Sequence, residues 1–185
     1  PITIETANQT MGLRTDEVVN FWYRKHPWEK PSQKEVSHEL DEKVIEIIKA
    51  KGKAKEGVNE AISVCESLGL PIAIASSSPT RLIQTVLTKL GIEDKIKIVH
   101  SAHDDEYGKP HPAVYIRTAI ELGIHPEHCL AFEDSANGVI SAKAAKMKCI
   151  AIPESNMRED KRFGIADIII PSLLDFTPHM LRELS

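Results

Sequence analysis

The sequence lacks three features that would each point to a particular class of protein. Its three cysteines, Cys65, Cys129 and Cys149, form no Cys-x-x-Cys pair and lie within apolar segments, which indicates reduced core residues of a cytoplasmic protein. Positive charge is not in excess, because 23 Lys and Arg face 27 Asp and Glu and give a net charge of −4. No apolar run approaches the ~20 residues of a membrane span. We therefore expect neither nucleic-acid nor membrane partners.

Two nucleotide-binding signatures are also missing. The chain has no Gly-x-Gly-x-x-Gly and no Gly-x-x-x-x-Gly-Lys-Ser/Thr segment, which argues against dinucleotide binding and P-loop hydrolysis. What is present is ordinary for a globular protein: 185 residues, of which 42% are hydrophobic and 27% are charged. This length and composition allow one well-packed domain, or one domain with a small appendage.

The hydrophobic pattern changes near Gly52. Before it, apolar residues recur at the three- and four-residue steps of buried helix faces, at Val18, Val19, Phe21 and Trp22 and then at Val36, Leu40, Val44, Ile47 and Ile48. A proline-containing stretch at 27–31 interrupts them and is predicted to be a loop. We therefore expect residues 1–52 to form a small, mostly helical domain.

Beyond residue 52, short apolar runs alternate with helical patterns. We expect helices over 58–68, 82–90, 112–122 and 135–147, and strands over 71–76, 96–100, 129–132, 149–152 and 167–170. Such alternation requires crossover connections and favours a parallel sheet with helices on both faces. Residues 53–185 are thus predicted to form an α/β core with a Rossmann-like, doubly wound parallel sheet.

Polar residues follow three of the predicted strands, at the sheet edge where parallel α/β proteins bind ligands. Ser76-Ser77-Ser78 ends the first strand, Lys109 follows the second, and Glu133-Asp134 ends the third. Hydroxyls and free amides at a helix start hold phosphate oxygens, lysine adds a compact charge, and Mg²⁺ prefers carboxylate ligands. Each group alone also has a structural interpretation, as helix caps or solvated loop residues. Together they predict a phosphate and magnesium site.

Three segments resemble motifs of a known family. Ala75-Ser76-Ser77-Ser78, Gly108-Lys109-Pro110-His111-Pro112 and Phe132-Glu133-Asp134-Ser135-Ala136-Asn137-Gly138 resemble the second, third and fourth motifs of the haloacid dehalogenase-like hydrolases. The branch resembled is the beta-phosphoglucomutase-like group of sugar phosphatases. Within it, Met11-Gly12-Leu13-Arg14 and Phe21-Trp22-Tyr23 are most similar to the cap of the 2-deoxyglucose-6-phosphate (hexitol) phosphatases. The resemblance implies that residues 1–52 are part of such a helical cap.

The resemblance also implies roles for the residues that would bind phosphate. Ser76 and Lys109 would be catalytic: the Ser76 hydroxyl and the Ser77 amide would hold phosphoryl oxygens, and Lys109 would neutralise both the phosphate and the attacking carboxylate. Asn137 would brace the loop. Arg14 would reach from the cap toward the sugar phosphate, with an exposed loop arginine as the alternative.

The same resemblance implies a Mg²⁺ cofactor, with Asp134 as a direct ligand and Glu133 beside it. The family's first motif, Asp-x-Asp-Gly, would supply the nucleophilic aspartate, but no segment of this sequence matches it. Asp104-Asp105-Glu106 is no substitute and is predicted to be a solvated acidic turn. We expect the motif to lie on an N-terminal first strand that this sequence lacks.

In the family, that first strand lies between the strand ending at Ser76 and the strand ending near Phe132. Its absence would leave backbone groups of both strands unpaired, at ~1–3 kcal/mol for each buried group. We therefore expect these 185 residues alone to be poorly folded and inactive, and their structure to contain a gap in the sheet.

These observations predict a Mg²⁺-dependent phosphatase of small sugar phosphates that acts through an aspartyl-phosphate. One alternative is a beta-phosphoglucomutase-type phosphotransferase, although Pro79 stands where a basic residue would favour the mutase. The other is a non-catalytic phosphate-binding protein. The expected partner is a small phosphorylated sugar, and the expected state is a cytoplasmic monomer.

Overall fold

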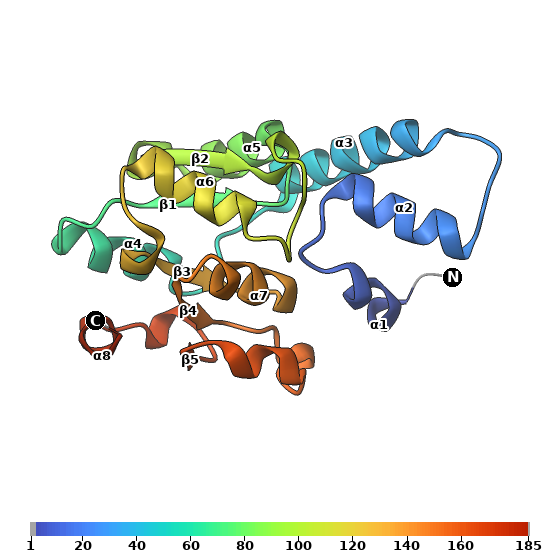
Figure 1. Cartoon of the computed structure of the whole chain (residues 1–185). Helices are drawn as coiled ribbons and strands as arrows, with labels where there is room; N and C mark the ends of the chain where they lie inside the picture. Colours follow the sequence, from blue (N-terminus) through green and yellow to red (C-terminus); the bar gives the residue numbers. More distant parts are fainter. Residues whose placement is uncertain (1–2, 185) are drawn as a thin grey trace.

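The computed structural model describes residues 3–184, which fold into a group of helices beside an α/β core (Figure 1). The helical part contains α1 (Ile4–Ala7), α2 (Thr15–Lys25) and α3 (Gln33–Lys51), and the last two pack against each other. The predicted loop at 27–31 is confirmed, since it connects α2 to α3. The domain boundary at residue 52 stays a prediction.

Hydrogen bonds fix the start of α2 and α3. We use the name cap for α1, α2 and α3 together. At α3, the Glu35 amide donates to Ser32 Oγ (3.3 Å) and the Ser32 amide donates to the Glu35 carboxylate (2.8 Å), which is a capping box. At α2, the Arg14 amide donates to the Glu17 carboxylate (2.9 Å). Val19 of α2 and Ile45 of α3 are buried, so the apolar faces of the helices hold the hairpin together.

The core strands form two parallel sheets. β1 (Ala73–Ser76) pairs with β2 (Ile98–Ser101), and β3 (Leu130–Glu133) pairs with β4 (Lys148–Ala151), which in turn pairs with β5 (Ile168–Ile169). All three pairings are parallel, which confirms the predicted α/β class. The strands start or end one or two residues away from the predicted positions.

Helices cover these strands and connect the two sheets. The core helices are α4 (Val58–Ser67), α5 (Thr80–Leu90), α6 (Ala113–Leu122), α7 (Ala136–Ala144) and α8 (Pro178–Glu183). α6 packs on β1 and β2, while α7 packs on β3 and β4 and also contacts α6. Val114 of α6, Val139 of α7 and Cys149 of β4 are fully buried in one cluster, so a continuous apolar core joins the sheets.

β1 and β3 are the neighbouring edges of the two sheets (Figure 1). Within residues 3–184, β1 pairs with β2 alone and β3 with β4 alone. That a first strand belongs between them stays a prediction from the family resemblance.

The described residues also bear on the expectations about membranes and cysteines. Among residues 3–184, no helix is both long and apolar enough to cross a membrane. The three thiols are free, and burial raises the pKa of Cys149 to about 12. Such a thiol stays protonated at neutral pH and acts as a small core side chain.

Candidate functional site

Lys109 lies at the centre of the site. Its side chain is only 7% exposed, and its Nζ donates to the Ala75 carbonyl at the end of β1 (3.0 Å) and to Tyr115 Oη (3.4 Å). The same ammonium forms a short ion pair with the Glu133 carboxylate at the end of β3. Lys109 therefore connects the facing edges of the two sheets, at the position where the sequence predicts phosphate chemistry.

Glu133 is a buried carboxylate with several donors around it. Its side chain is 6% exposed, Tyr115 Oη donates to it (2.5 Å), and the Ser135 hydroxyl donates to it (3.2 Å). Burial and the charge of Glu133 raise the pKa of Tyr115 well above its ordinary value, so the phenol remains a donor at neutral pH. The buried charge is thus compensated by Lys109 and neutral hydrogen bonds.

Gly138 makes room for that carboxylate. A Cβ at Gly138 would stand 2.0 Å from Glu133 Oε2, which is far inside contact distance. The preceding turn is fixed by Ser135, whose Oγ accepts from the Gly138 amide (3.0 Å) and so caps α7. The helix-cap interpretation of the Glu-Asp-Ser segment is therefore confirmed for Ser135.

Asp134 points away from Glu133. Its side chain is 54% exposed, and Lys55 Nζ donates to it (2.9 Å) and to Glu154 (2.7 Å). Burial opposes the charged form of Lys55, but the hydrogen bonds to the two carboxylates outweigh it and raise the pKa of Lys55. Lys55 therefore carries its charge at neutral pH between two acidic side chains.

The described residues do not form a complete Mg²⁺ site. Across residues 3–184, no three His, Cys, Asp or Glu side chains are grouped to hold a metal ion. Of the two carboxylates predicted as ligands, Glu133 is engaged by Lys109 and Asp134 by Lys55. We derive no chemical step from a cation on these residues alone.

The serine loop after β1 is organised by its own hydrogen bonds. Ser76 Oγ accepts from the Ser78 amide (3.1 Å), and Ser77 Oγ donates to the Gly12 carbonyl of the cap segment (2.7 Å). The alternative that these serines cap the following helix is wrong, because α5 begins after Pro79 without a side-chain cap. The proposed phosphate role of Ser76 and Ser77 stays a prediction.

The segment that leads into α2 crosses between the loops after β1 and β3. Asn137 Nδ2 donates to the Met11 carbonyl (2.9 Å), so Asn137 holds this segment to α7. Gly12 has φ +82°, and a Cβ there would stand 2.5 Å from Ser135 Oγ. The close approach and the left-handed backbone both require glycine at this position.

Arg14 connects the cap to the loop after β2. Its side chain is 14% exposed, and Nη1 donates to the carbonyls of Ala102 (3.2 Å) and Asp105 (3.1 Å). This placement differs from the exposed arginine given as the alternative. Arg14 has no contact with Ser76 or Lys109 among the interactions of the described residues, so its role toward the substrate stays a prediction.

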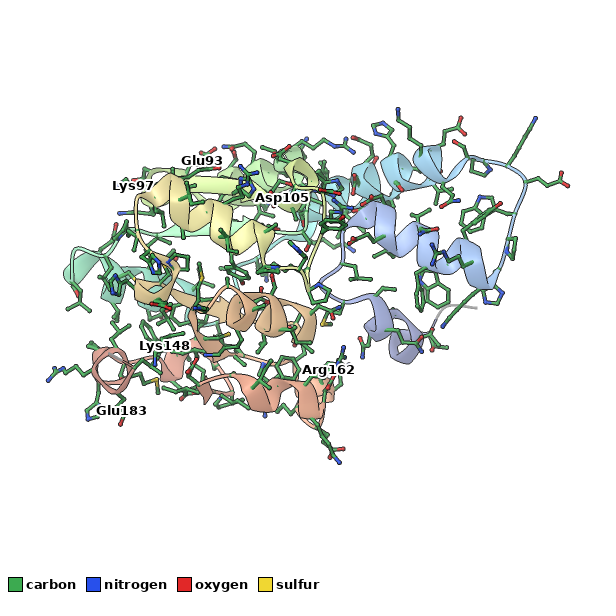
Figure 2. The ribbon with its side chains drawn as sticks, viewed as in Figure 1. Glu93, Lys97, Asp105, Lys148, Arg162 and Glu183 are labelled. Carbon is green, nitrogen blue, oxygen red and sulfur yellow. The ribbon has the colours of Figure 1, made fainter. Side chains whose placement is uncertain are left out.

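The prediction of a solvated acidic turn at 104–106 is wrong for Asp105. Its side chain is 4% exposed and lies 3.2 Å from His100 Nε2, at the edge of the core that faces the cap (Figure 2). Arg14 binds the backbone of the same residue. The acidic sequence at 104–106 does not show that two basic residues from other elements lie beside this carboxylate. These residues are His100 of β2 and Arg117 of α6.

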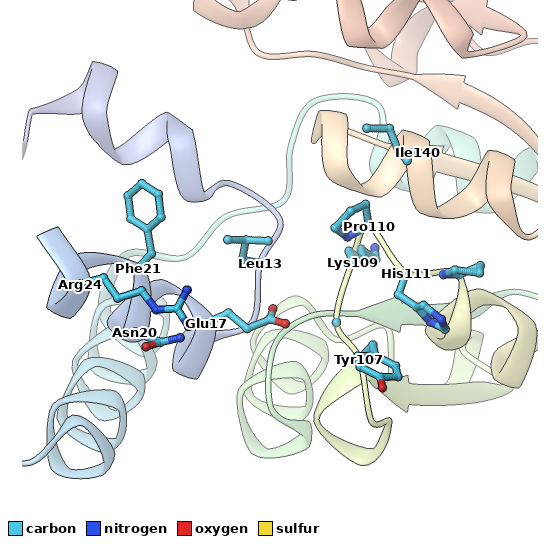
Figure 3. Close-up of a pocket in the computed structure, with 12 residues that line it drawn as sticks. Leu13, Glu17, Asn20, Phe21, Arg24, Tyr107, Lys109, Pro110, His111 and Ile140 are labelled. Atoms are coloured by element: carbon cyan, nitrogen blue, oxygen red, sulfur yellow. The ribbon is translucent and has the colours of Figure 1, made fainter.

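A cavity of about 680 Å³ lies between the cap and the core (Figure 3). Glu17, Asn20 and Arg24 of α2 face the loop that carries Tyr107 and Lys109 across this cavity. None of these three α2 residues is among those predicted from the sequence. Their spacing of three and four residues, next to the cap motif, is the signal that would have found them.

Comparison with known proteins shows the family to which this sequence is similar. The family model for the haloacid dehalogenase-like hydrolases matches residues 8–146. Hexitol phosphatase B of Escherichia coli (strain K12) is 39% identical over 168 residues, which cover 91% of this chain and 76% of that protein.

Two solved structures share the fold. CbbY from Rhodobacter sphaeroides in complex with phosphate aligns with a TM-score of 0.83 at 21% identity, over 94% of this chain and 80% of that one. Beta-phosphoglucomutase from Clostridium difficile aligns with a TM-score of 0.84 at 19% identity, over 99% of this chain and 82% of that one. At these identities the likeness establishes the fold alone.

Proposed function

Because the chain belongs to the haloacid dehalogenase-like hydrolases, we propose that it hydrolyses the phosphate monoesters of small sugars or sugar alcohols. The observation that carries this proposal is the position of Lys109. The residue lies between the ends of β1 and β3, and it also lines the cavity under the cap. A phosphoryl group bound there would meet a buried cation, with room beside it for a sugar.

The residues of this chain would act mainly by positioning and charge. Phosphoryl transfer depends on neutralising the oxygens of the transferring group, and a lysine supplies a compact charge for this purpose. In our proposal, Lys109 exchanges part of its contact with Glu133 for the phosphate, while Ser76 and the Ser77 amide hold the other oxygens. Glu17, Asn20 and Arg24 offer polar contacts to the hydroxyl groups of the substrate.

Two parts of the proposal rest on the family alone. The aspartate that would attack the phosphorus belongs to the Asp-x-Asp-Gly motif, which this sequence does not contain. A Mg²⁺ requirement is proposed with Asp134, the more open carboxylate, as one ligand. A cytoplasmic location and a monomeric state also remain predictions.

The test is phosphate release by the protein expressed from its complete natural reading frame. A panel of hexose, pentose and hexitol phosphates is assayed with Mg²⁺ and after exhaustive chelation. We expect release from one or more members of the panel, lost on chelation and restored by Mg²⁺. Isomerised sugar phosphate without release would favour the mutase, and tight binding without turnover would favour the binding protein. Either result contradicts the proposal.

A further inference from the structure

We infer that Asp41 is a positioning residue, which links the loop that would hold the phosphate to the cap helix that would contact the sugar. This inference rests on the proposed function and adds a residue that sets the width of the substrate site. Asp41 lies on α3 and is not among the residues that line the cavity under the cap. It would therefore act through its neighbours and would not touch the substrate.

Asp41 is a buried carboxylate with a partner on each side. Its side chain is 11% exposed. Thr15 Oγ1 donates to Asp41 Oδ1 (2.8 Å), and Arg81 Nη2 donates to Asp41 Oδ2 (3.2 Å). Both carboxylate oxygens are thus engaged, one by the cap and one by the core. Hydrogen bonds to a charged group are strong, and burial shields these two from water.

The two partners of Asp41 lie next to the two ends of the proposed substrate site. Thr15 is the first residue of α2, the cap helix that lines the cavity. Arg81 is the second residue of α5, the helix that follows the serine loop after β1. The path from Thr15 through Asp41 to Arg81 therefore connects the sugar end of the site to its phosphate end.

The core side of this path is firmly held. The Arg81 guanidinium also forms an ion pair with Glu42 and lies 3.4 Å from His38 Nδ1, so three residues of α3 contact it. α3 and α5 pack against each other (Figure 1). Apolar packing between α2 and α3 is non-directional, so it does not by itself fix where α2 lies along α3. The bond from Thr15 to Asp41 supplies that direction.

The chain offers matched variants for each side of the path. Thr15→Val keeps the shape of the side chain and removes the donor, whereas Thr15→Ser keeps the donor. Arg81→Met removes the other partner of Asp41. Glu42→Gln is its control, because it weakens the second ion pair of Arg81 and leaves the bond to Asp41 in place. Arg81→Lys, which loses the planar fork, replaces Arg81→Met if the latter does not fold.

The experiment measures kcat and KM for the best sugar phosphate, and the inhibition constant of inorganic phosphate, in the protein from its complete natural reading frame. Circular dichroism melts verify folding. We expect Thr15→Val and Arg81→Met each to raise KM about tenfold, because the sugar contacts on α2 are displaced. The double variant should raise KM no further, because both substitutions break one path.

The other quantities should change little. Inorganic phosphate has no sugar to reach α2, so its inhibition constant should stay within about twofold of wild type, and kcat likewise, as expected when only binding contacts are lost. Thr15→Ser and Glu42→Gln should also stay within about twofold in KM, since an exposed ion pair contributes little.

The outcomes separate this inference from the proposed function. Unchanged KM in folded Thr15→Val overturns the inference, as do effects that multiply in the double variant or an equal weakening of inorganic phosphate. No phosphate release from wild type contradicts the proposed function instead. Hydrogen exchange of residues 14–20 then decides the inference: faster exchange in Thr15→Val but not in Thr15→Ser supports it, and equal exchange overturns it.

Discussion

Gly138 shows how a single residue fixes the geometry of the site. The Glu133 carboxylate occupies the place where a side chain at Gly138 would begin. This carboxylate in turn accepts hydrogen bonds from Lys109, Tyr115 and Ser135. A side chain at position 138 would therefore displace the buried Glu133 carboxylate from these hydrogen-bond partners.

Gly138→Ala should lower the free energy of unfolding by about 2 kcal/mol, as overpacking of a core does. Gly164→Ala is the matched control, since a Cβ at Gly164 would meet no atom within 4 Å. Urea unfolding of both variants is the measurement. A loss in Gly138→Ala no larger than in Gly164→Ala would show that Glu133 relocates at little cost.

Among the elements, the short strand β5 is held in place partly by one side chain, that of Asp167. It is two residues long, and the preceding Asp167 accepts from the Cys149 amide of β4 (2.7 Å) and from Lys143 Nζ of α7 (2.6 Å). Partial burial raises the pKa of Asp167, but the hydrogen bonds from Lys143 and Cys149 outweigh it and lower that pKa below the ordinary 3.8. The carboxylate form therefore stabilises the contact between β4, β5 and α7.

Asp167→Asn should reduce the free energy of unfolding by ~1 kcal/mol at pH 7. Because the pKa of the folded state is lowered, this contribution is complete above the unfolded value and is lost as pH falls through the folded value. The stability difference between wild type and variant should therefore shrink below about pH 4. Chemical denaturation from pH 7 to 3 measures it, with Asp175→Asn as control. A difference that does not change with pH contradicts this account.

At the scale of elements, the sequence predicted most of the core. Apolar runs ended by polar residues located all five strands within one or two positions, because burial on both faces leaves a continuous apolar signal. Helix ends were less accurate: α7 ends at Ala144 and Lys146 adopts φ +64°, although apolar residues continue to Met147. The apolar pattern indicates which residues are buried, but it does not indicate at which residue a helix ends.

For the whole molecule, the cap, the two sheets and the site meet at a few residues. Lys109 binds residues at the ends of both β1 and β3. Asn137 and Ser77 donate hydrogen bonds to the Met11-Gly12 segment. Arg14 donates a hydrogen bond from the cap to the loop after β2. The sequence predicted that Lys109 and Glu133 meet at these strand ends, and the structure pairs them. It did not predict that Glu133, the last residue of β3, is buried against Lys109 while Asp134, the next residue, is half exposed beside Lys55. Partners from distant segments decide which of the two carboxylates is buried.

The central claim is that Lys109 is the phosphate-binding cation of a sugar-phosphate phosphatase. The most direct measurement is kcat/KM for the best substrate in wild type, Lys109→Arg and Lys97→Arg, each with its melting temperature. Arginine keeps the charge beside Glu133 but replaces the compact ammonium with a larger planar group. Lys97 stands just before β2, away from the cap, so Lys97→Arg is the control for the same exchange of side chains (Figure 2). We predict a loss of about a hundredfold in Lys109→Arg alone. Equal kcat/KM in all three folded proteins would contradict the account.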